Sequence, residues 1–133
     1  MKIRQTYTCP LELVHDMLKG KWKPIILWRL RLGKTPLAQL ERDIDGITQK
    51  MLLEHLKELC ELGFVSKQTS NGYPLRTDYF LTPTHGEKIL QALQIMQEIG
   101  IDYMKEHGMH DVLREKGLLK DECPQKSGQF TYQ

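Results

Sequence analysis

The chain has 133 residues, of which 40% are hydrophobic and 27% charged, and its net charge is +2. We expect one domain over residues 1–133, without a membrane span, because no apolar run approaches the ~20 residues that a span needs. The N-terminus lacks the apolar stretch of a signal peptide, so we expect a cytoplasmic protein whose three cysteines are kept reduced.

The first part of the chain predicts two short helices. Pro10 suits the first turn of a helix over residues 10–18, because that turn needs no amide hydrogen from its first residue. A second helix is predicted from Pro24 to about Gly33, with one apolar face.

The next segment has the pattern of a helix-turn-helix. Thr35 is expected to cap a short helix over residues 36–42, with proline in its first position. A turn leads to a second helix over residues 48–62, capped by Thr48 and ended by a glycine. The leucines of this helix share one face, so the shorter helix can cover them. In this arrangement the second helix enters the major groove of DNA.

The first turn of that second helix is polar and consists of Thr48, Gln49 and Lys50. A glutamine can bond adenine through two hydrogen bonds, and a lysine can bond guanine or phosphate. We therefore predict that these residues contact bases, with Lys57 on the same polar face as a further candidate. The alternative is a solvated polar face, which any amphipathic surface helix has.

The periodicity then changes from helical to extended. Residues 64–69 and 76–81 predict two strands, joined by a turn over residues 70–75. Such a hairpin is a wing, and Asn71 and Arg76 are expected to meet the DNA backbone or the minor groove. The predicted fold is mainly α with a small β-hairpin wing, that is, a winged helix-turn-helix.

A long helix is predicted from Pro83 to about His107, with Thr82 as its cap. A short helix over residues 111–116 follows, and the tail after Cys123 is expected to be unstructured. The long helix is apolar over a wider arc than one subunit covers, which predicts a homodimer on a palindromic operator. The residues that widen this arc are Leu90, Ile95, Ile101 and Met104.

Charge is distributed unevenly along the chain. The segment 19–34 has no acid and contains six basic residues, namely Lys19, Lys21, Lys23, Arg29, Arg31 and Lys34. A run of this kind favours a polyanionic partner such as double-stranded DNA. We predict that Lys21, Lys23 and Lys34 contact phosphates, together with Arg76 from the wing.

Several segments, in this order and at these spacings, resemble the HxlR-type regulators, a branch of the winged-helix proteins near MarR. The segments are Cys9-Pro10, "GKW" at 20–22, "IIL" at 25–27, "GITQKMLLEHLKELCELGFV" at 46–65, "YP" at 73–74 and "DYFLTPTHG" at 78–86. They cover about residues 9–104 and leave residues 109–133 as a C-terminal extension. The resemblance implies a transcription factor without enzymatic activity that dimerises through its N- and C-terminal helices.

The cysteines raise a second hypothesis. Cys9 precedes a helix, where unpaired amides and the helix dipole favour a thiolate. The resemblance adds that some family members sense oxidants or electrophiles through a cysteine at this position, and Cys123 is the first candidate for a resolving partner. The alternative is a structural Cys9. Cys60 is expected to pack beside the leucine face.

Other functions have less support from the residues. His107, His110 and Cys123 are irregularly spaced for zinc, so we expect no metal site. No catalytic constellation or phosphate loop is present, so we expect no cofactor and no enzyme. Two alternatives stay open. One is a winged-helix interaction module without DNA binding, and the other is a regulator with a small-molecule inducer and no cysteine chemistry.

Overall fold

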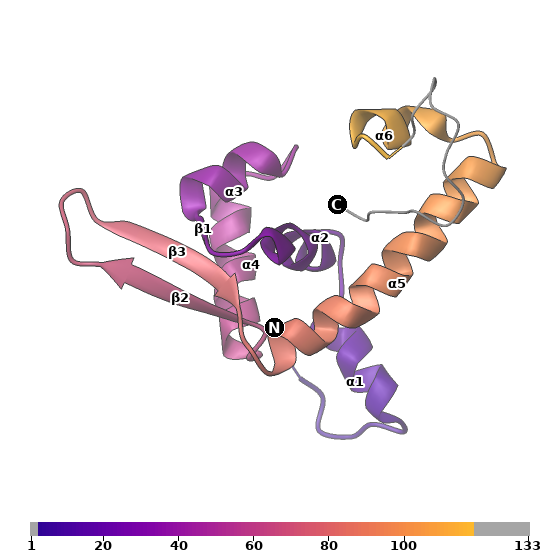
Figure 1. The fold of residues 1–133 in the computed structure, drawn as a ribbon. Coiled ribbons are helices and arrows are strands. Elements are labelled where there is room, and N and C mark those ends of the chain that lie inside the picture. The colour runs from indigo at the N-terminus through magenta and orange to yellow at the C-terminus, as the bar shows by residue number, and fades with distance from the viewer. Residues whose placement is uncertain (1–2, 119–133) are drawn as a thin grey trace. The chain divides into compact units, whose positions relative to one another are not determined.

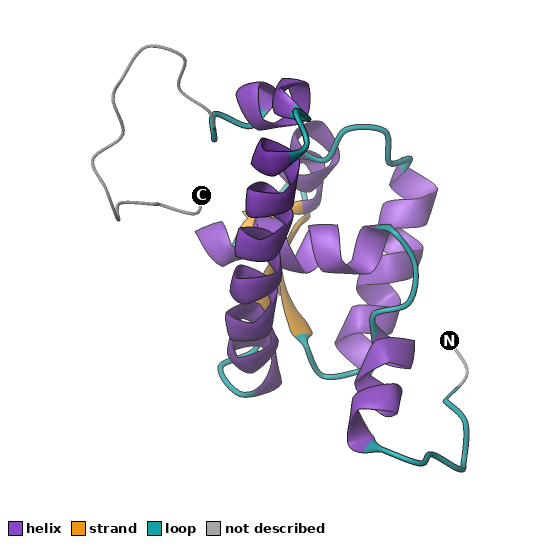
Figure 2. Cartoon of the chain, turned by 90° about the vertical axis from the view of Figure 1, so that its right-hand side faces the viewer, coloured by secondary structure: helices purple, strands orange, loops and turns teal. Residues whose placement is uncertain are grey.

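The computed structural model describes residues 3–118, which are mainly helical with a small sheet (Figure 2). The chain groups into two compact units, the first ending at Leu90 and the second beginning at Gln91. The single domain expected over residues 1–133 stays a prediction. Cys123 and the tail after it lie outside the described residues.

The first two helices are close to those predicted. Helix α1 comprises Pro10–Met17 and helix α2 comprises Trp22–Arg29, followed by a short 3-10 helix, η1 (Leu30–Leu32). Helix α2 begins two residues before Pro24. This proline therefore lies in the first turn, where its missing amide hydrogen has no helical acceptor to reach.

The predicted helix-turn-helix is confirmed as α3 (Leu37–Asp43) and α4 (Gln49–Glu61), and Figure 1 shows both beside α2. The Oγ1 atom of Thr48 accepts a hydrogen bond from the backbone N–H of Met51 at 3.2 Å, so Thr48 caps α4 as predicted. The leucine face is also confirmed, because Leu52, Leu56 and Leu59 are all completely buried. Helix α2 packs against both α3 and α4.

The wing is confirmed as the hairpin of β2 (Val65–Ser70) and β3 (Arg76–Leu81), which extends away from α3 and α4 in Figure 1. A third strand, β1 (Thr35–Pro36), was not predicted. It pairs with β3 in an antiparallel manner, with Thr35 opposite Tyr79, so the sheet order is β1-β3-β2.

The capping role expected for Thr35 is wrong. Its hydroxyl donates a hydrogen bond to the carbonyl oxygen of Gly33 at 2.7 Å, and α3 begins at Leu37 with Pro36 in the preceding extended position. Pairing with β3 holds Thr35 in extended backbone, so the cap-then-proline pattern here marks a strand.

Helix α5 (His85–Glu106) and helix α6 (His110–Glu115) complete the described chain. Helix α5 begins two residues after Pro83. The hydroxyl of Thr82 accepts a hydrogen bond from the backbone N–H of Gly86 at 2.8 Å and donates one to the carbonyl oxygen of Gly63 at 2.8 Å. Thr82 therefore joins the start of α5 to the end of α4.

The core of the first unit combines residues from its helices and its sheet: Ile26, Leu27, Leu30, Leu40, Ile44, Ile47, Leu52, Leu56, Leu59, Phe64, Val65, Tyr79 and Leu81. In the second unit, Leu93, Ile101 and Leu113 are buried. Among the described helices, none has the length and apolar character needed to cross a membrane.

Candidate nucleic-acid interface

The first turn of α4 presents its polar residues to solvent. Thr48, Gln49 and Lys50 are all exposed, while the leucines of the same helix are buried on the opposite side. The oxygen of the Thr48 hydroxyl accepts from the Met51 amide and its O–H remains a donor, so Thr48, Gln49 and Lys50 can all donate from this turn. Lys57 is exposed further along the helix. The positive end of the helix dipole adds to the attraction for an anion at this end.

The strand register places two predicted basic contacts on one face of the sheet. Val65 and Leu81 are opposite each other and buried, so their face is the inner one. Because successive side chains of a strand point to opposite faces of the sheet, the residues next to Val65 and Leu81 point outward. On that outer face Lys34 donates from Nζ to Oε1 of Gln68 at 2.5 Å and lies 5.4 Å from the ring centroid of Phe80.

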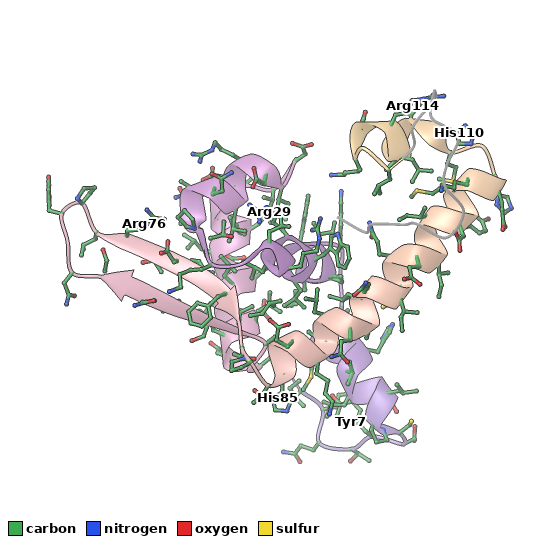
Figure 3. The ribbon with its side chains drawn as sticks, in the orientation of Figure 1. Tyr7, Arg29, Arg76, His85, His110 and Arg114 are labelled. Atoms are coloured by element: carbon green, nitrogen blue, oxygen red, sulfur yellow. The ribbon has the colours of Figure 1, made fainter. Side chains whose placement is uncertain are left out.

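Arg76 belongs to the same outer face, because it lies an odd number of positions from the inward-facing Leu81 in the same strand. Its Nε donates to Oδ1 of Asp78 at 2.9 Å, and its side chain is 61% exposed. Figure 3 shows Arg76 on the hairpin, away from the helices. Asn71 lies in the exposed turn between the two strands. The outer face of the sheet therefore carries two cations, Lys34 and Arg76, whose positions are set by neighbouring polar groups.

The basic run is divided by burial. Lys21 is exposed, and its Nζ lies 4.5 Å from the ring centroid of Trp22. Lys23 differs from the expectation, since it is only 5% exposed and its Nζ lies 3.5 Å from Oε2 of Glu58. A lysine held in this way has no surface from which to meet a phosphate, so we remove Lys23 from the candidate phosphate contacts.

The cysteines occupy different environments. Cys9 is exposed and lies in the N-cap position of α1, in extended backbone, without capping the helix through its side chain. Cys60 is half-buried. Burial raises the pKa of its thiol, and this effect outweighs the opposite effect of the nearby charge of Lys67. Within the described residues, therefore, Cys9 is the more accessible thiol.

Two acidic residues of α1, Glu12 in its first turn and Asp16 near its end, hold the segment that precedes the helix. Arg4 forms ion pairs with Glu12 at 2.7 Å and Asp16 at 2.9 Å, and its guanidinium lies over the ring of Tyr7. The backbone and the hydroxyl of Thr8 both donate to Glu12. The charge of Arg4 is thus directed to these carboxylates.

One exposed cation of the wing was missed. Lys67 lies on β2 and is exposed, although it is opposite the buried Tyr79. Alternation in the sequence places Lys67 on the same face as Val65 and so predicts burial, and only the structure shows that this side chain is exposed. Among residues 3–118, no three His, Cys, Asp or Glu side chains gather in a way that could hold a metal ion.

Comparison with known proteins gives a consistent result. Residues 17–108 match the model of the HxlR-like helix-turn-helix family. YkvN, an HTH-type transcriptional regulator of Bacillus subtilis, is 31% identical over 115 residues, which covers 84% of this chain and 97% of YkvN.

Two solved structures add to this similarity. The redox regulator HypR in its oxidised form has a TM-score of 0.66 and 32% identity, covering 71% of this chain and 96% of HypR. The transcriptional regulator YodB from B. subtilis in its reduced form has a TM-score of 0.61 and 31% identity, covering 69% of this chain and 90% of YodB.

Proposed function

This chain belongs to the HxlR-like helix-turn-helix family of transcriptional regulators, and we propose that it binds a specific DNA operator as a homodimer through α4 and the wing. The observation that carries the proposal is the division of α4 between two faces. Its leucines are completely buried, whereas Gln49 and Lys50 in its first turn are exposed. Helices of this kind contact base edges with their N-terminal residues.

The basic residues support a contact with the DNA backbone. Lys34 and Arg76 lie on the outer face of the sheet, and Lys21 is exposed before α2. These side chains supply a sequence-independent attraction, while the first turn of α4 supplies base contacts. Lys50 and Lys57 on α4 and Asn71 in the turn of the wing are further candidates.

An exposed apolar face on α5 supports the homodimer. Ile95, Met96, Ile99 and Tyr103 are each more than half exposed and fall on one side of the helix. Of the residues expected to widen this face, Ile101 is only 5% exposed and is therefore unavailable to a partner, whereas Ile95 is 59% exposed. A second copy covering the face would place two copies of α4 on a palindromic site.

The response to oxidants or electrophiles is the further part of the proposal, with Cys9 as the sensing residue. Its exposure and its place at the start of α1 support this role. A further support is that HypR, one of the similar solved structures, is itself a redox regulator. A small-molecule inducer acting without cysteine chemistry is the alternative route to regulation.

The proposal is tested with purified protein and labelled DNA from upstream of its own gene and the neighbouring genes. We expect a salt-dependent complex with one of these fragments, and a footprint with two-fold symmetry. Fragments from elsewhere in the genome are the control and should bind far more weakly. Absence of a salt-dependent complex with any fragment would favour the alternative, a winged-helix interaction module without DNA binding.

A further inference from the structure

Helix α2 forms an ion pair with each helix of the helix-turn-helix. Near its start, Nζ of Lys23 lies 3.5 Å from Oε2 of Glu58 on α4, and the two side chains are 6% and 24% exposed. At its end, Nε of Arg29 donates to Oδ2 of Asp43, the last residue of α3, at 2.8 Å. Figure 3 shows Arg29 where α2 meets α3.

The second ion pair is supported from within α3. The side-chain amide of Gln39 donates to both carboxylate oxygens of Asp43 at 3.0 Å, and Arg29 Nη2 also contacts this carboxylate. Arg29 and Asp43 are 17% and 30% exposed, so solvent screens the pair only in part. The hydrogen bonds from Gln39, and then those from Arg29, lower the pKa of Asp43.

A partly buried ion pair adds little net stability compared with an apolar pair of the same volume, but its N–O contact lasts only while the two helices keep their positions. The two pairs lie at opposite ends of α2, about 9 Å apart along its axis at 1.5 Å per residue. They therefore tie two separate helices to one support, at two different points along it.

We propose that Lys23 and Arg29 are positioning residues for DNA recognition, which set the orientation of α4 and α3 on α2 through Glu58 and Asp43. The inference rests on the proposed function. Glu58 is nine residues after Gln49, roughly 13 Å along α4. A change of tilt at Glu58 would move the first turn of α4, and bidentate hydrogen bonds to bases are broken by small displacements.

The test uses Lys23→Met in the full chain, which keeps the length of the side chain and removes its charge. Lys21→Met is the matched control, because Lys21 is an exposed lysine two residues earlier. Operator and unrelated duplex affinities are measured over a range of salt concentrations, with circular dichroism to check folding. For Lys23→Met we expect at least a tenfold loss on the operator, no loss on unrelated DNA and an unchanged salt slope. Lys21→Met should weaken both.

Two results would overturn the proposal. Equal losses on both duplexes, with the salt slope reduced by about 0.9, would make Lys23 a phosphate contact. Unchanged operator affinity in a folded Lys23→Met variant would leave the ion pair with a structural role alone. If Lys23→Met does not fold, Glu58→Gln removes the charge of the partner and is judged by the same criteria.

A second measurement separates this proposal from DNA binding itself. Residual dipolar couplings of backbone amides report the orientation of α4 relative to α2 in the free protein. We expect this orientation to change in Lys23→Met but not in Lys21→Met, whether or not the wild type binds DNA. If α4 has the same orientation relative to α2 in Lys23→Met as in Lys21→Met, the positioning role is contradicted. If the wild type binds no DNA, the proposed function fails, while the couplings still decide whether Lys23 positions α4.

Discussion

Gly86 lies directly against the carbonyl oxygen of Phe64. This oxygen occupies the space that a Cβ atom on residue 86 would need. The backbone carbonyl carbon of Leu81 would also be only 3.0 Å from such an atom. Since both neighbours are backbone atoms, neither can move aside as a flexible side chain would. The first turn of α5 therefore passes close to the residues between α4 and β2, and glycine is what allows this.

The first prediction is that Gly86→Ala lowers the free energy of unfolding by about 1–3 kcal/mol or more, which is the usual cost of overpacking a core. Gly100→Ala is the control in the same helix, because a Cβ there meets nothing within 4 Å. It should stabilise by up to ~1 kcal/mol through helix propensity. Urea denaturation of both variants gives the comparison, and changes of the same sign in both would contradict the predicted clash.

The contrast between these glycines illustrates what the sequence could show. Local patterns were sufficient for α4, because the leucine spacing, the Thr48 cap and the glycine after the helix all act within a few residues. They were insufficient for β1. Thr35 and Pro36 have the local pattern of a helix start, and only their pairing with the distant β3 makes them a strand. That pairing joins residues more than 40 positions apart, as Thr35 and Tyr79 are.

The candidate site was predictable to a similar extent. The exposure of Gln49 and Lys50 follows from the helical period. Lys23 could not be separated from Lys21 by the same means, because its burial depends on Glu58, which lies far along the chain on another helix. A lysine in a basic run is expected at the surface, and only the packing of α2 on α4 places this one inside.

The second prediction concerns the base contacts of α4. Gln49→Ala should weaken operator binding by ~1–3 kcal/mol and affect an unrelated duplex much less, because the variant cannot form bidentate hydrogen bonds to a base. Lys50→Ala distinguishes a base contact from a phosphate contact, since the latter weakens both duplexes alike. Fluorescence anisotropy at fixed salt gives the affinities. Unchanged operator affinity in the Gln49→Ala, Lys50→Ala double variant would refute the assignment of α4.

The third prediction concerns phosphate contacts. Replacing Lys21, Lys34 or Arg76 by alanine should reduce the slope of log K against log salt by ~0.9 for each phosphate that the variant no longer neutralises, on operator and unrelated DNA alike. Asp78→Asn is a useful control, because it frees Arg76 from its carboxylate partner and should not reduce the slope. If the salt slope is unchanged in the triple alanine variant, these side chains are hydrated at the surface and contact no phosphate.

The fourth prediction concerns assembly. Ile99 is 64% exposed at the centre of the apolar face of α5, so Ile99→Glu should place a charge in the proposed subunit contact and produce monomers. Gln94→Glu introduces the same charge away from that face and should leave the dimer intact. Sedimentation equilibrium at micromolar concentration separates the two forms. A wild type that is already monomeric at this concentration would contradict the homodimer.

The fifth prediction is that Cys9 transmits an oxidant or electrophile signal to DNA binding. The thiol is exposed at the start of α1, and Arg4 of the preceding segment is paired with Glu12 and Asp16. Modification of Cys9, or a disulfide between subunits, would then act at the end of a helix that is tied to the N-terminal segment by these ion pairs. Oxidation through a sulfenic acid to a disulfide is reversible by thiols, so the signal would be transient.

Operator binding by wild type and Cys9→Ser is measured before and after diamide or a quinone, with a non-reducing gel alongside. We expect a loss of about tenfold in the wild type, ~1.4 kcal/mol, that dithiothreitol reverses, and no loss in Cys9→Ser. Cys60→Ser should respond like the wild type, because burial raises the pKa of the Cys60 thiol and so keeps it protonated and unreactive. Cys123→Ser then identifies the resolving thiol, since a disulfide-linked species that disappears in this variant requires Cys123. If wild type and Cys9→Ser respond equally, or neither responds, Cys9 is structural and regulation must come through a different ligand.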